Sequence, residues 1–371
     1  MADYYIGLIS GTSMDGIDAV LVRFEPACRV LAQINAPYSA PMMRALDSLR
    51  HDPDAFPVAS MARLDAELGD AFAAAALAVM QQANVQPQAI RAIGSHGQTV
   101  LHRAGPQDHP AHTLQIGDPH RIAATTGIVT VADFRRADLA AGGQGAPLAP
   151  LIHQALLADS GEYRVVVNLG GIANLTRLHP KRAVSGFDTG PANCFLDAWY
   201  RRHHSGRFDR GGHWAASGKV DTSWLKRLMS EPYFSLPPPK STGIEYFSLA
   251  WLEERLPDWA AKRPEDVQAT LAEFTAISLV EAITQDDTGP DRLLVCGGGV
   301  HNHDLLERIR RQIACPVQST GDFGLDPDIV EATLFAWLAR ERLNERPVKT
   351  GSITGANQPI LAGAIFQPPG T

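Results

Sequence analysis

The sequence predicts a two-lobed α/β fold that arises from an internal duplication. The chain has 371 residues, which is long for a single core, so two domains are expected. Two segments share one pattern, in which an apolar strand leads into a glycine loop and a second apolar strand follows. They are YYIGLISGTSMDGIDAVLV at 4–22 and YRVVVNLGGIANLTRL at 163–178. Two such lobes would face each other across a cleft, a geometry that commonly closes around a ligand.

The composition excludes several classes of protein. Hydrophobic residues make up 45% of the chain and charged residues 20%, which is ordinary for a globular protein. The net charge of −7 argues against a nucleic-acid partner. None of the four cysteines belongs to a C-x-x-C pair, which favours reduced thiols. We see neither a signal-peptide pattern nor an apolar run that would span a bilayer, so we expect a cytoplasmic protein without a membrane partner.

The first glycine loop, GTSMDGID at 11–18, lies between two apolar stretches. A hairpin turn would by itself explain its glycine, hydroxyl and carboxylate residues. The alternative is a phosphate cradle, in which N–H groups and hydroxyls bind phosphate oxygens and the Asp handles a cation. No Lys follows the loop, so it is not a P-loop. The loop alone does not decide between a turn and a cradle.

Two more glycine loops follow apolar strands. NLGGIAN at 168–174 is a second phosphate-loop candidate, and CGGGVHN at 296–302 fits a nucleoside contact because glycines permit close backbone approach. Each of them, taken alone, is better explained as an ordinary turn. Open α/β folds nevertheless bind ligands where buried strands deliver such loops to one edge of a sheet.

Helical segments separate the strands. Residues 58–83 predict one long amphipathic helix. Pro is favoured in the first turn of a helix, so further helices should begin at Pro191 and Pro264. Another is expected from Asp326, while the segments 140–150 and 235–243 are rich in Gly or Pro and predict loops.

The boundary between the lobes is expected near residues 131–133, where an apolar strand ends. Lobe I would comprise residues 1–132, and lobe II residues 133–355. The C-terminal segment TGANQPILAGAIF should return to lobe I, which would then include about residues 356–371.

Three polar motifs could carry chemistry. GFDTGPAN places Asp188 between a strand and a helix, where it is either a helix cap or a general base that takes a proton from a hydroxyl or a water. SHGQT at 95–99 is either a solvated turn or a polar floor for a sugar. Asp133 and Arg135, from TVADFRRADLAAGGQGAPL, form either a surface ion pair or a ligand contact. The residues alone leave these alternatives open.

Together these motifs closely resemble the anhydro-N-acetylmuramic acid kinase family. The resemblance extends nearly end to end and is carried by GTSMDGID, SHGQT, VADFRRADLAAGGQGAPL, NLGGIANLT, GFDTGPAN, KSTGIEYF, DVQATLAEFTA and CGGGVHN. One departure is Ile244, where KSTG-x-E-x-F would have a polar residue. The order of the three glycine loops resembles that of the actin–hexokinase–acetate kinase superfamily. The resemblance implies an actin-like ATPase (ribonuclease H-like) fold, with duplicated lobes around a central nucleotide cleft.

The resemblance also implies an activity. The protein would be a phosphotransferase with an alcohol acceptor that uses ATP and Mg²⁺ in peptidoglycan recycling. It would open the 1,6-anhydro ring of 1,6-anhydro-N-acetylmuramic acid with water and phosphorylate O6, giving N-acetylmuramic acid 6-phosphate and ADP. Asp188 would deprotonate the water, and Glu331 would sit nearby and help to position it. A homodimer is the expectation for the family.

The other site residues follow from the matching motifs. The resemblance implies that Asp15 lies near Mg²⁺ and that the glycine loops bind ATP through Gly11, Thr12, Ser13, Met14, Asp15, Gly16, Ile17, Asp18, Asn168, Gly170, Gly171, Asn174, Gly297, Gly298 and Gly299. The sugar candidates are Ser95, His96, Asp133 and Arg135.

Two alternative functions differ from this one in a defined way. A related anhydrosugar kinase, such as one acting on levoglucosan, would keep the ATP loops and the base but would not recognise the lactyl ether and the N-acetyl group. A non-catalytic ATP-driven clamp of the actin or heat-shock type would need neither GFDTGPAN nor SHGQT.

Overall fold

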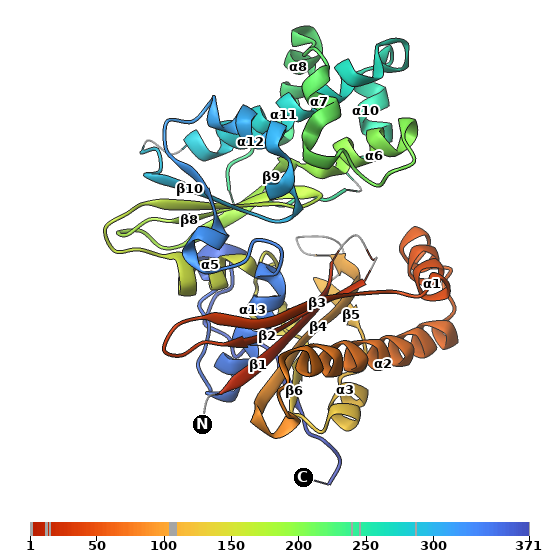
Figure 1. Cartoon of the computed structure of the whole chain (residues 1–371), viewed down its shortest axis with the longest axis vertical. Coiled ribbons are helices and arrows are strands. Elements are labelled where there is room, and N and C mark those ends of the chain that lie inside the picture. The colour runs from red at the N-terminus through yellow and green to blue at the C-terminus, as the bar shows by residue number, and fades with distance from the viewer. Residues whose placement is uncertain are drawn as a thin grey trace. The chain divides into compact units, whose positions relative to one another are not determined.

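The computed structural model describes residues 3–11, 14, 16–103, 110–238, 240–244, 246–285 and 288–370. The chain divides into two compact units. Unit 1 comprises Met1–Ile152 and Ile329–Thr371, and unit 2 comprises His153–Asp328. Each unit is built around its own β-sheet with helices beside it (Figure 1). The predicted α/β class with two sheets is confirmed.

Unit 1 contains a seven-stranded sheet with the order β12-β6-β4-β1-β2-β3, in which β5 also pairs with β4. Strands β1, β2 and β3 form an antiparallel meander, while β4 runs parallel to β1 and β6 parallel to β4. The strands are β1 (Tyr4–Ser10), β2 (Gly16–Arg23), β3 (Arg29–Pro37), β4 (Ile90–Arg103), β5 (His112–Ile116), β6 (Thr130–Ala132) and β12 (Ala364–Phe366).

Unit 2 contains a five-stranded sheet with the order β11-β10-β7-β8-β9. Its strands repeat the pattern of the first sheet, with an antiparallel meander β7-β8-β9 followed by β10 parallel to β7 and β11 parallel to β10. This shared topology is what duplicated lobes require. The strands are β7 (Arg164–Leu169), β8 (Ile172–Leu178), β9 (Ser185–Pro191), β10 (Arg292–Cys296) and β11 (Val317–Ser319).

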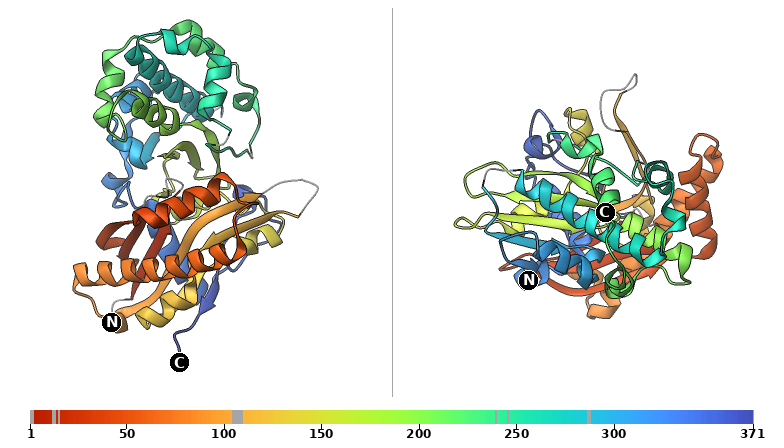
Figure 2. Two further views of the ribbon diagram at one scale, coloured as in Figure 1. Left: turned by 90° about the vertical axis from the view of Figure 1, so that its right-hand side faces the viewer. Right: turned by 90° about the horizontal axis from the view of Figure 1, so that it is seen from above.

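The helices of unit 1 cover both faces of its sheet. The predicted helix over 58–83 is present as α2, which lies along one face, as Figures 1 and 2 show. The helices that begin in unit 1 are α1 (Ala40–His51), α2 (Val58–Ala83), α3 (Pro119–Thr126), α4 (Arg136–Ala140), α5 (Ala149–Leu157), α13 (Val330–Leu343) and α14 (Gly351–Thr354), with a 3₁₀ turn η1 (Pro87–Ala89).

The helices of unit 2 pack around α11, which begins at Pro264 as predicted. This helix is long and apolar enough to cross a membrane by length and composition, but 78% of its most apolar window is buried, as in a core helix. The helices are α6 (Asn193–His203), α7 (His213–Ser217), α8 (Thr222–Met229), α9 (Pro232–Ser235), α10 (Leu249–Arg255), α11 (Pro264–Thr284) and α12 (His303–Arg310), with 3₁₀ turns η2 (Arg210–Gly212), η3 (Trp259–Ala261), η4 (Gly298–His301) and η5 (Thr320–Phe323).

Two helices begin later than the sequence predicts. Pro191 pairs with Ile172 in the β8–β9 ladder, so α6 begins only at Asn193. Helix α13 begins at Val330 rather than near Asp326. The segment before it is held by a hydrogen bond to another part of the chain, because the Pro327 carbonyl accepts the N–H of Gly297 at 2.9 Å. In both cases a contact with a distant part of the chain outweighs the local helix signal.

The unit boundaries differ from those expected. The chain leaves unit 1 after residue 152 rather than 132, and it returns at 329 rather than near 356. The reason is that α13 packs on β1 and β4, while Phe134 packs against Phe335 of this helix with ring centroids 5.2 Å apart. The segments on both sides of the expected boundaries therefore share the core of unit 1.

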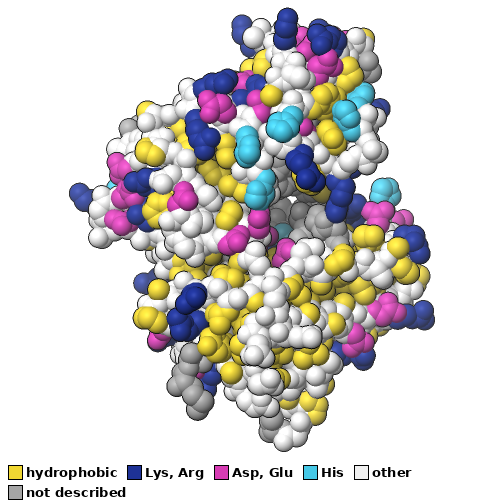
Figure 3. Space-filling view, in the orientation of Figure 1, with side chains coloured by type: hydrophobic (Ala, Val, Ile, Leu, Met, Phe, Trp, Pro, Cys, Tyr) yellow, Lys and Arg dark blue, Asp and Glu magenta, His cyan; other side chains and the backbone are white. Residues whose placement is uncertain are grey.

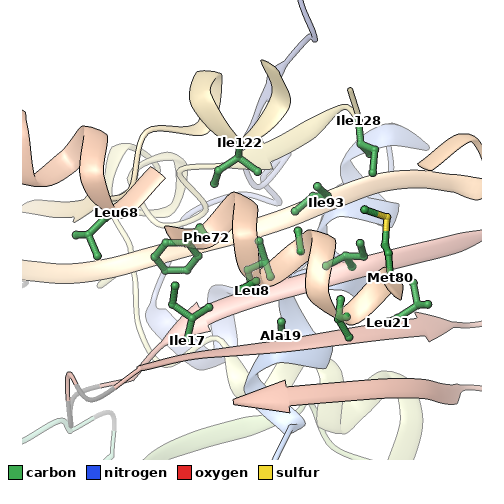
Figure 4. Close-up of a cluster of buried hydrophobic side chains, with 14 of the residues drawn as sticks. Leu8, Ile17, Ala19, Leu21, Leu68, Phe72, Met80, Ile93, Ile122 and Ile128 are labelled. Carbon is green, nitrogen blue, oxygen red and sulfur yellow. The ribbon is translucent and has the colours of Figure 1, made fainter. Parts of the chain in front are cut away.

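The core between α2 and the first sheet is apolar throughout. Figure 4 shows Phe72 and Leu68 of α2 together with Leu8 and Ile17 from the strands, and Ile122 of α3 joins the same cluster. On the face of the molecule in Figure 3, Lys and Arg side chains are interspersed with Asp and Glu. Hydrophobic side chains are also visible on this face, as is normal for a globular protein.

On the other face of the sheet, two glycines let helix α13 approach very closely. Gly7 of β1 and Gly94 of β4 are partners in the parallel ladder. A Cβ atom on Gly7 would lie 1.8 Å from the carbonyl oxygen of Ala332, and one on Gly94 would lie 2.0 Å from that of Phe335. No side chain fits at either position, so the helix backbone rests directly on the strands.

Prediction: Gly94→Ala should lower the free energy of unfolding by about 3 kcal/mol, because the new methyl group forces the helix away from the sheet. Urea denaturation followed by circular dichroism measures this loss. Gly289→Ala is the matched control, since nothing lies within 4 Å of the Cβ that it adds. Equal stability of the two variants would contradict the close-packing argument.

The buried His153 makes stability depend on pH. Its side chain is 0% exposed, its Nδ1 lies 2.8 Å from the Thr176 hydroxyl, and burial lowers its pKa to about 3. The unfolded chain protonates this histidine near pH 6.5, whereas the folded chain stays neutral down to about pH 3. The unfolded state therefore binds more protons in this window, and stability is lost as the pH falls through it.

Prediction: between pH 7 and pH 5, His153 alone should cost about 2 kcal/mol of unfolding free energy. Denaturant titrations at both pH values measure the loss. His153→Asn, which keeps an amide near Thr176 but cannot titrate, should reduce the loss by that amount. An unchanged pH dependence in this variant would show that His153 is not responsible.

Candidate active site

The first glycine loop is described in part, at Gly11, Met14 and residues 16–18. Three of its candidate residues lie outside the described residues, namely Thr12, Ser13 and Asp15. The phosphate and Mg²⁺ contacts expected of these residues therefore also lie outside the described part of the chain. The Met14 N–H donates to the Gly11 carbonyl at 3.2 Å, and Met14 has a φ of 52°. A non-glycine residue in the left-handed region is uncommon and marks a tight turn here.

The remaining candidates of this loop belong to β2. Ile17 is 1% exposed and packs in the core, so it anchors the loop rather than facing a ligand. Asp18 accepts a hydrogen bond at 2.7 Å from the Asn35 amide. Gly16 lies against β3, where a Cβ would come 2.6 Å from the Ala36 carbonyl oxygen.

Gln98 of the SHGQT motif holds the base of the loop. Its Oε1 accepts a hydrogen bond from the Ser10 hydroxyl at 2.6 Å, and its Nε2 donates to the Gly11 carbonyl at 3.4 Å. The sequence analysis missed this role. The available signal was that Gln98 lies in a polar motif within an otherwise apolar strand.

The second glycine loop is anchored through its carbonyl groups. Gly170 accepts hydrogen bonds from the Asn193 N–H at 3.0 Å and from the Asn193 amide at 2.9 Å. Gly171 accepts from Ala192 at 3.0 Å and from Cys194 at 3.1 Å. Among the described residues, no hydrogen bond uses the N–H of Gly170 or Gly171. These two donors are available for an anion, as in other backbone anion sites.

The third glycine loop packs against the second. Strands β7 and β10 are neighbours, with Cys296 in register with Asn168. A Cβ on Gly297 would lie 2.1 Å from the Asn168 Oδ1, whereas a Cβ on Gly298 would meet nothing within 4 Å. Gly299 packs like Gly297, with a Cβ that would come 2.4 Å from Leu169. Gly298 is therefore the glycine of this loop that has space beside it.

Three candidates form a row across the second sheet. Asn168 of β7 is in register with Asn174 of β8, which is in register with Asp188 of β9. The sheet thus places the candidate base beside the second glycine loop. Asp188 lies within β9 and does not cap α6, whose N-cap is Ala192, so the helix-cap interpretation is wrong.

The Pro-rich loop holds Asp188 from several sides. The Asp188 N–H donates to the Lys240 carbonyl at 3.2 Å, and the Thr242 N–H donates to the Asp188 Oδ2 at 3.0 Å. The Tyr233 hydroxyl donates to the Asp188 carbonyl at 2.6 Å. Backbone and carboxylate are therefore both fixed by residues about 45 to 54 positions further along the chain.

Lys240 stabilises the Pro-rich loop through hydrogen bonds to two carbonyl groups. Its ammonium group donates to the carbonyls of Tyr233 and Phe234, each at 3.1 Å, and burial lowers its pKa. Ile244, the departure from the family pattern, is 37% exposed, and its Cγ2 would lie 3.5 Å from a Cβ on Gly171. The apolar side chain at this position therefore lies near the second glycine loop. The sequence analysis missed Lys240 and Thr242, although both lie in KSTG, and nothing local indicated Tyr233.

His96 is neutral and already bonded at both ring nitrogens. Its Nε2 accepts a hydrogen bond from the Arg135 Nε at 2.9 Å, which leaves Nδ1 to donate to the Gly97 carbonyl at 3.0 Å. Burial, reinforced by the charge of Arg135, holds the pKa of His96 well below its usual value. The ring also packs on Phe335, with centroids 4.5 Å apart. His96 therefore positions Arg135.

Arg135 and Glu331 form a charged group in unit 1. Burial lowers the pKa of Arg135 to about 10, and nearby Glu331 opposes this shift, so the guanidinium is charged at neutral pH. The surrounding protein raises the pKa of Glu331, Arg135 lowers it and Asp18 raises it. The net effect is a raised pKa for Glu331, and loss of hydration is its largest cause. Asp188 belongs to unit 2.

Unit 1 also contains a cavity of about 400 Å³ that is lined by Ser95, His96 and Asp133. The Ser95 hydroxyl is buried and has no hydrogen-bond partner among the described residues. Asp133 has a φ of 60°, a left-handed conformation of the kind that clusters at functional sites. The volume lies in the range typical of small-molecule pockets. Three sugar candidates therefore meet in one cavity, and Arg135 is bonded to one of them.

No described group of three or more His, Cys, Asp or Glu residues could hold a metal ion. This is compatible with Mg²⁺, which keeps several waters and uses one or two carboxylates together with substrate phosphates.

The sequence of the whole chain decides the family. A family model described as anhydro-N-acetylmuramic acid kinase matches residues 3–368. The chain belongs to the anhydro-N-acetylmuramic acid kinase family. A relative of that name from Xanthomonas campestris pv. campestris (strain 8004) is 51% identical over 367 residues, 98% of this chain and 97% of the relative. Another from Pasteurella multocida (strain Pm70) is 47% identical over 365 residues, 98% of this chain and 96% of the relative.

Membership of this family makes the protein a kinase, a phosphotransferase with an alcohol group as acceptor that uses ATP. The likeness to solved structures is distant. A ROK family glucokinase from Streptomyces griseus in complex with glucose and AMPPNP aligns with a TM-score of 0.39 and 15% identity, over 91% of this chain and 99% of that chain.

Prediction: Tyr233→Phe should lower kcat by about tenfold and leave the KM for ATP unchanged, because it removes one buried hydrogen bond that positions the candidate base. Steady-state kinetics measure both constants. Tyr246→Phe is the matched control, since its hydroxyl bonds to Glu231 rather than to Asp188. If both variants lost the same activity, a general loosening of the loop would explain the effect instead.

Proposed function

We propose that this protein phosphorylates 1,6-anhydro-N-acetylmuramic acid with ATP while it hydrolyses the anhydro bridge, and that the products are N-acetylmuramic acid 6-phosphate and ADP. The observation that carries the proposal is the fixed carboxylate of Asp188. It is held by the Thr242 N–H and lies in register with Asn174 and Asn168, beside the second glycine loop. A base next to an anion site is what a reaction combining water attack with phosphoryl transfer requires.

In this mechanism Asp188 accepts a proton from a water molecule as the water oxygen attacks the anomeric carbon. The bond between that carbon and O6 breaks, and O6 takes the electron pair. O6 then attacks the γ-phosphorus of ATP, and ADP leaves. Coupling the two steps means that the negative charge on O6 passes to phosphate oxygens, which preorganised donors can stabilise.

The glycine loops would supply those donors. The N–H groups of Gly170 and Gly171 would bind phosphate oxygens together with the loop at 11–18, and the loop at 297–299 would border the adenosine. Gly298 supports this assignment because the space beside it is open. Mg²⁺, held by Asp15, would neutralise phosphate charge. Glu331 remains the proposed water-positioning residue.

The cavity of unit 1 is proposed to receive the sugar. Ser95 supports this because its buried hydroxyl has no hydrogen-bond partner among the described residues, and Asp133 offers a carboxylate to sugar hydroxyls. Arg135, which His96 orients, is the proposed cationic contact. We also propose that the protein acts as a homodimer in the cytoplasm, as its family resemblance suggests.

Prediction: the protein, incubated with Mg-ATP and 1,6-anhydro-N-acetylmuramic acid in ¹⁸O-water and quenched rapidly, should give a sugar phosphate with one ¹⁸O at the anomeric carbon. Mass spectrometry of product and fragments measures the label. Unlabelled N-acetylmuramic acid 6-phosphate, kept in the same water for the same time, corrects for exchange. A phosphorylated product without label would overturn the proposed water attack.

The same assay tests the base. Asp188→Asn should abolish turnover and leave ATP binding nearly unchanged, because it removes the proton acceptor but keeps the shape. Near-normal turnover in this variant would refute the role of Asp188. If the wild-type protein bound ATP but left the muramic sugar unmodified, levoglucosan would be the next substrate to test. If levoglucosan were not phosphorylated either, the non-catalytic ATP-driven clamp would be the next function to test.

A further inference from the structure

The cavity of unit 1 carries a cation that the proposed reaction leaves unused. Arg136, the first residue of α4, lines the cavity together with Asp65 and Asp133. Its contacts are long: Nη1 lies 3.4 Å from the Asp133 Oδ2, and Nε donates to the Thr113 carbonyl at 3.5 Å. The side chain is 54% exposed. Part of the guanidinium fork is therefore open to a ligand in the cavity.

The rest of the lining includes both polar and apolar side chains. Ser95 provides a buried hydroxyl that has no hydrogen-bond partner among the described residues. Apolar side chains contributed by α2, β5 and β12 form an apolar wall of the cavity, namely Met61, Leu114, Ile116 and Phe366. Such a wall suits methyl groups. The cavity thus combines a cation, hydroxyl-binding groups and an apolar surface.

We propose that Arg136 binds the carboxylate of the lactyl ether on the sugar and that the apolar wall receives the methyl groups of the substrate. The proposal rests on the proposed function and deepens it, because it names the group that selects an acidic anhydro sugar over an uncharged one. The guanidinium fork suits a carboxylate, to which it can donate two parallel hydrogen bonds.

The two carboxylates of the cavity strengthen this selection. Asp65 accepts a hydrogen bond from the Gly117 N–H at 2.7 Å, and Asp133 lies beside Arg136, so both are held in place. They suit sugar hydroxyls but repel an acid. Arg136 is the only Arg or Lys among the described residues that line the cavity, so a carboxylate bound next to it would fix the orientation of the sugar. Without Arg136 the two acidic groups would repel an anionic ligand more strongly, while a neutral ligand would be little affected.

The test compares binding of two sugars by isothermal titration calorimetry, without turnover. One is 1,6-anhydro-N-acetylmuramic acid, and the other is 1,6-anhydro-N-acetylglucosamine, which lacks only the lactyl ether. Arg136→Gln should weaken binding of the acid by about 10- to 100-fold and change the Kd of the neutral sugar by less than about threefold. Arg136→Lys should fall between wild type and Arg136→Gln for the acid, since it keeps the charge but not the fork.

Arg121→Gln is the matched control, because Arg121 is an exposed residue of α3 that pairs with Asp70 and does not line the cavity. It makes the same change in charge and should leave both affinities unchanged. Equal loss for the two sugars in Arg136→Gln, or unchanged binding of the acid, would overturn the inference. So would a wild-type protein that fails to bind the acid.

Failure of the proposed function would look different. Wild-type protein would bind the acid, Arg136→Gln would weaken that binding selectively, and no phosphorylated sugar would form with Mg-ATP. That result would refute the reaction and leave the carboxylate contact standing.

Discussion

The close approach of α13 to β1 and β4 is the constraint on which the organisation of unit 1 depends. Only glycine at positions 7 and 94 lets the helix backbone rest on the strands. The same helix carries Phe335, which packs against both Phe134 and the ring of His96. It also carries Glu331. The two glycines thus help to set the positions of Glu331, a candidate catalytic residue, and of His96, which orients Arg135.

Unit 2 repeats the sheet topology of unit 1, but its candidate base, Asp188, is held in place by loops rather than by a closely packed helix. Gly297 packs on Asn168, which brings the second and third glycine loops together, and the Pro-rich loop fixes Asp188 through Tyr233, Lys240 and Thr242. A buried ammonium group bonded to two carbonyls holds that loop in shape. One duplicated architecture therefore carries a sugar-sized cavity in unit 1 and a fixed carboxylate in unit 2, because their loops differ.

Local signals in the sequence predicted much of this structure. The glycine loops after β1, β7 and β10 were recognisable because each follows a buried strand, at the edge of a sheet where open α/β folds bind ligands. Helices α2 and α11 have the predicted starts, since periodicity and Pro264 act within a few residues. The starts of α6 and α13 were misplaced, because Pro191 pairs with β8 and Pro327 bonds to Gly297, and both partners are distant in sequence.

The sequence by itself determined the family, the α/β class and the residue types available for chemistry, because motif order and strand patterns are local or collinear. Tertiary structure decided which side chains act together. It assigned His96 to Arg135, Gln98 to the first glycine loop and Tyr233 to Asp188, and it drew 133–152 and α13 into unit 1. Each of these pairings crosses tens of residues. Burial and hydrogen-bond satisfaction choose such partners only when the chain is folded.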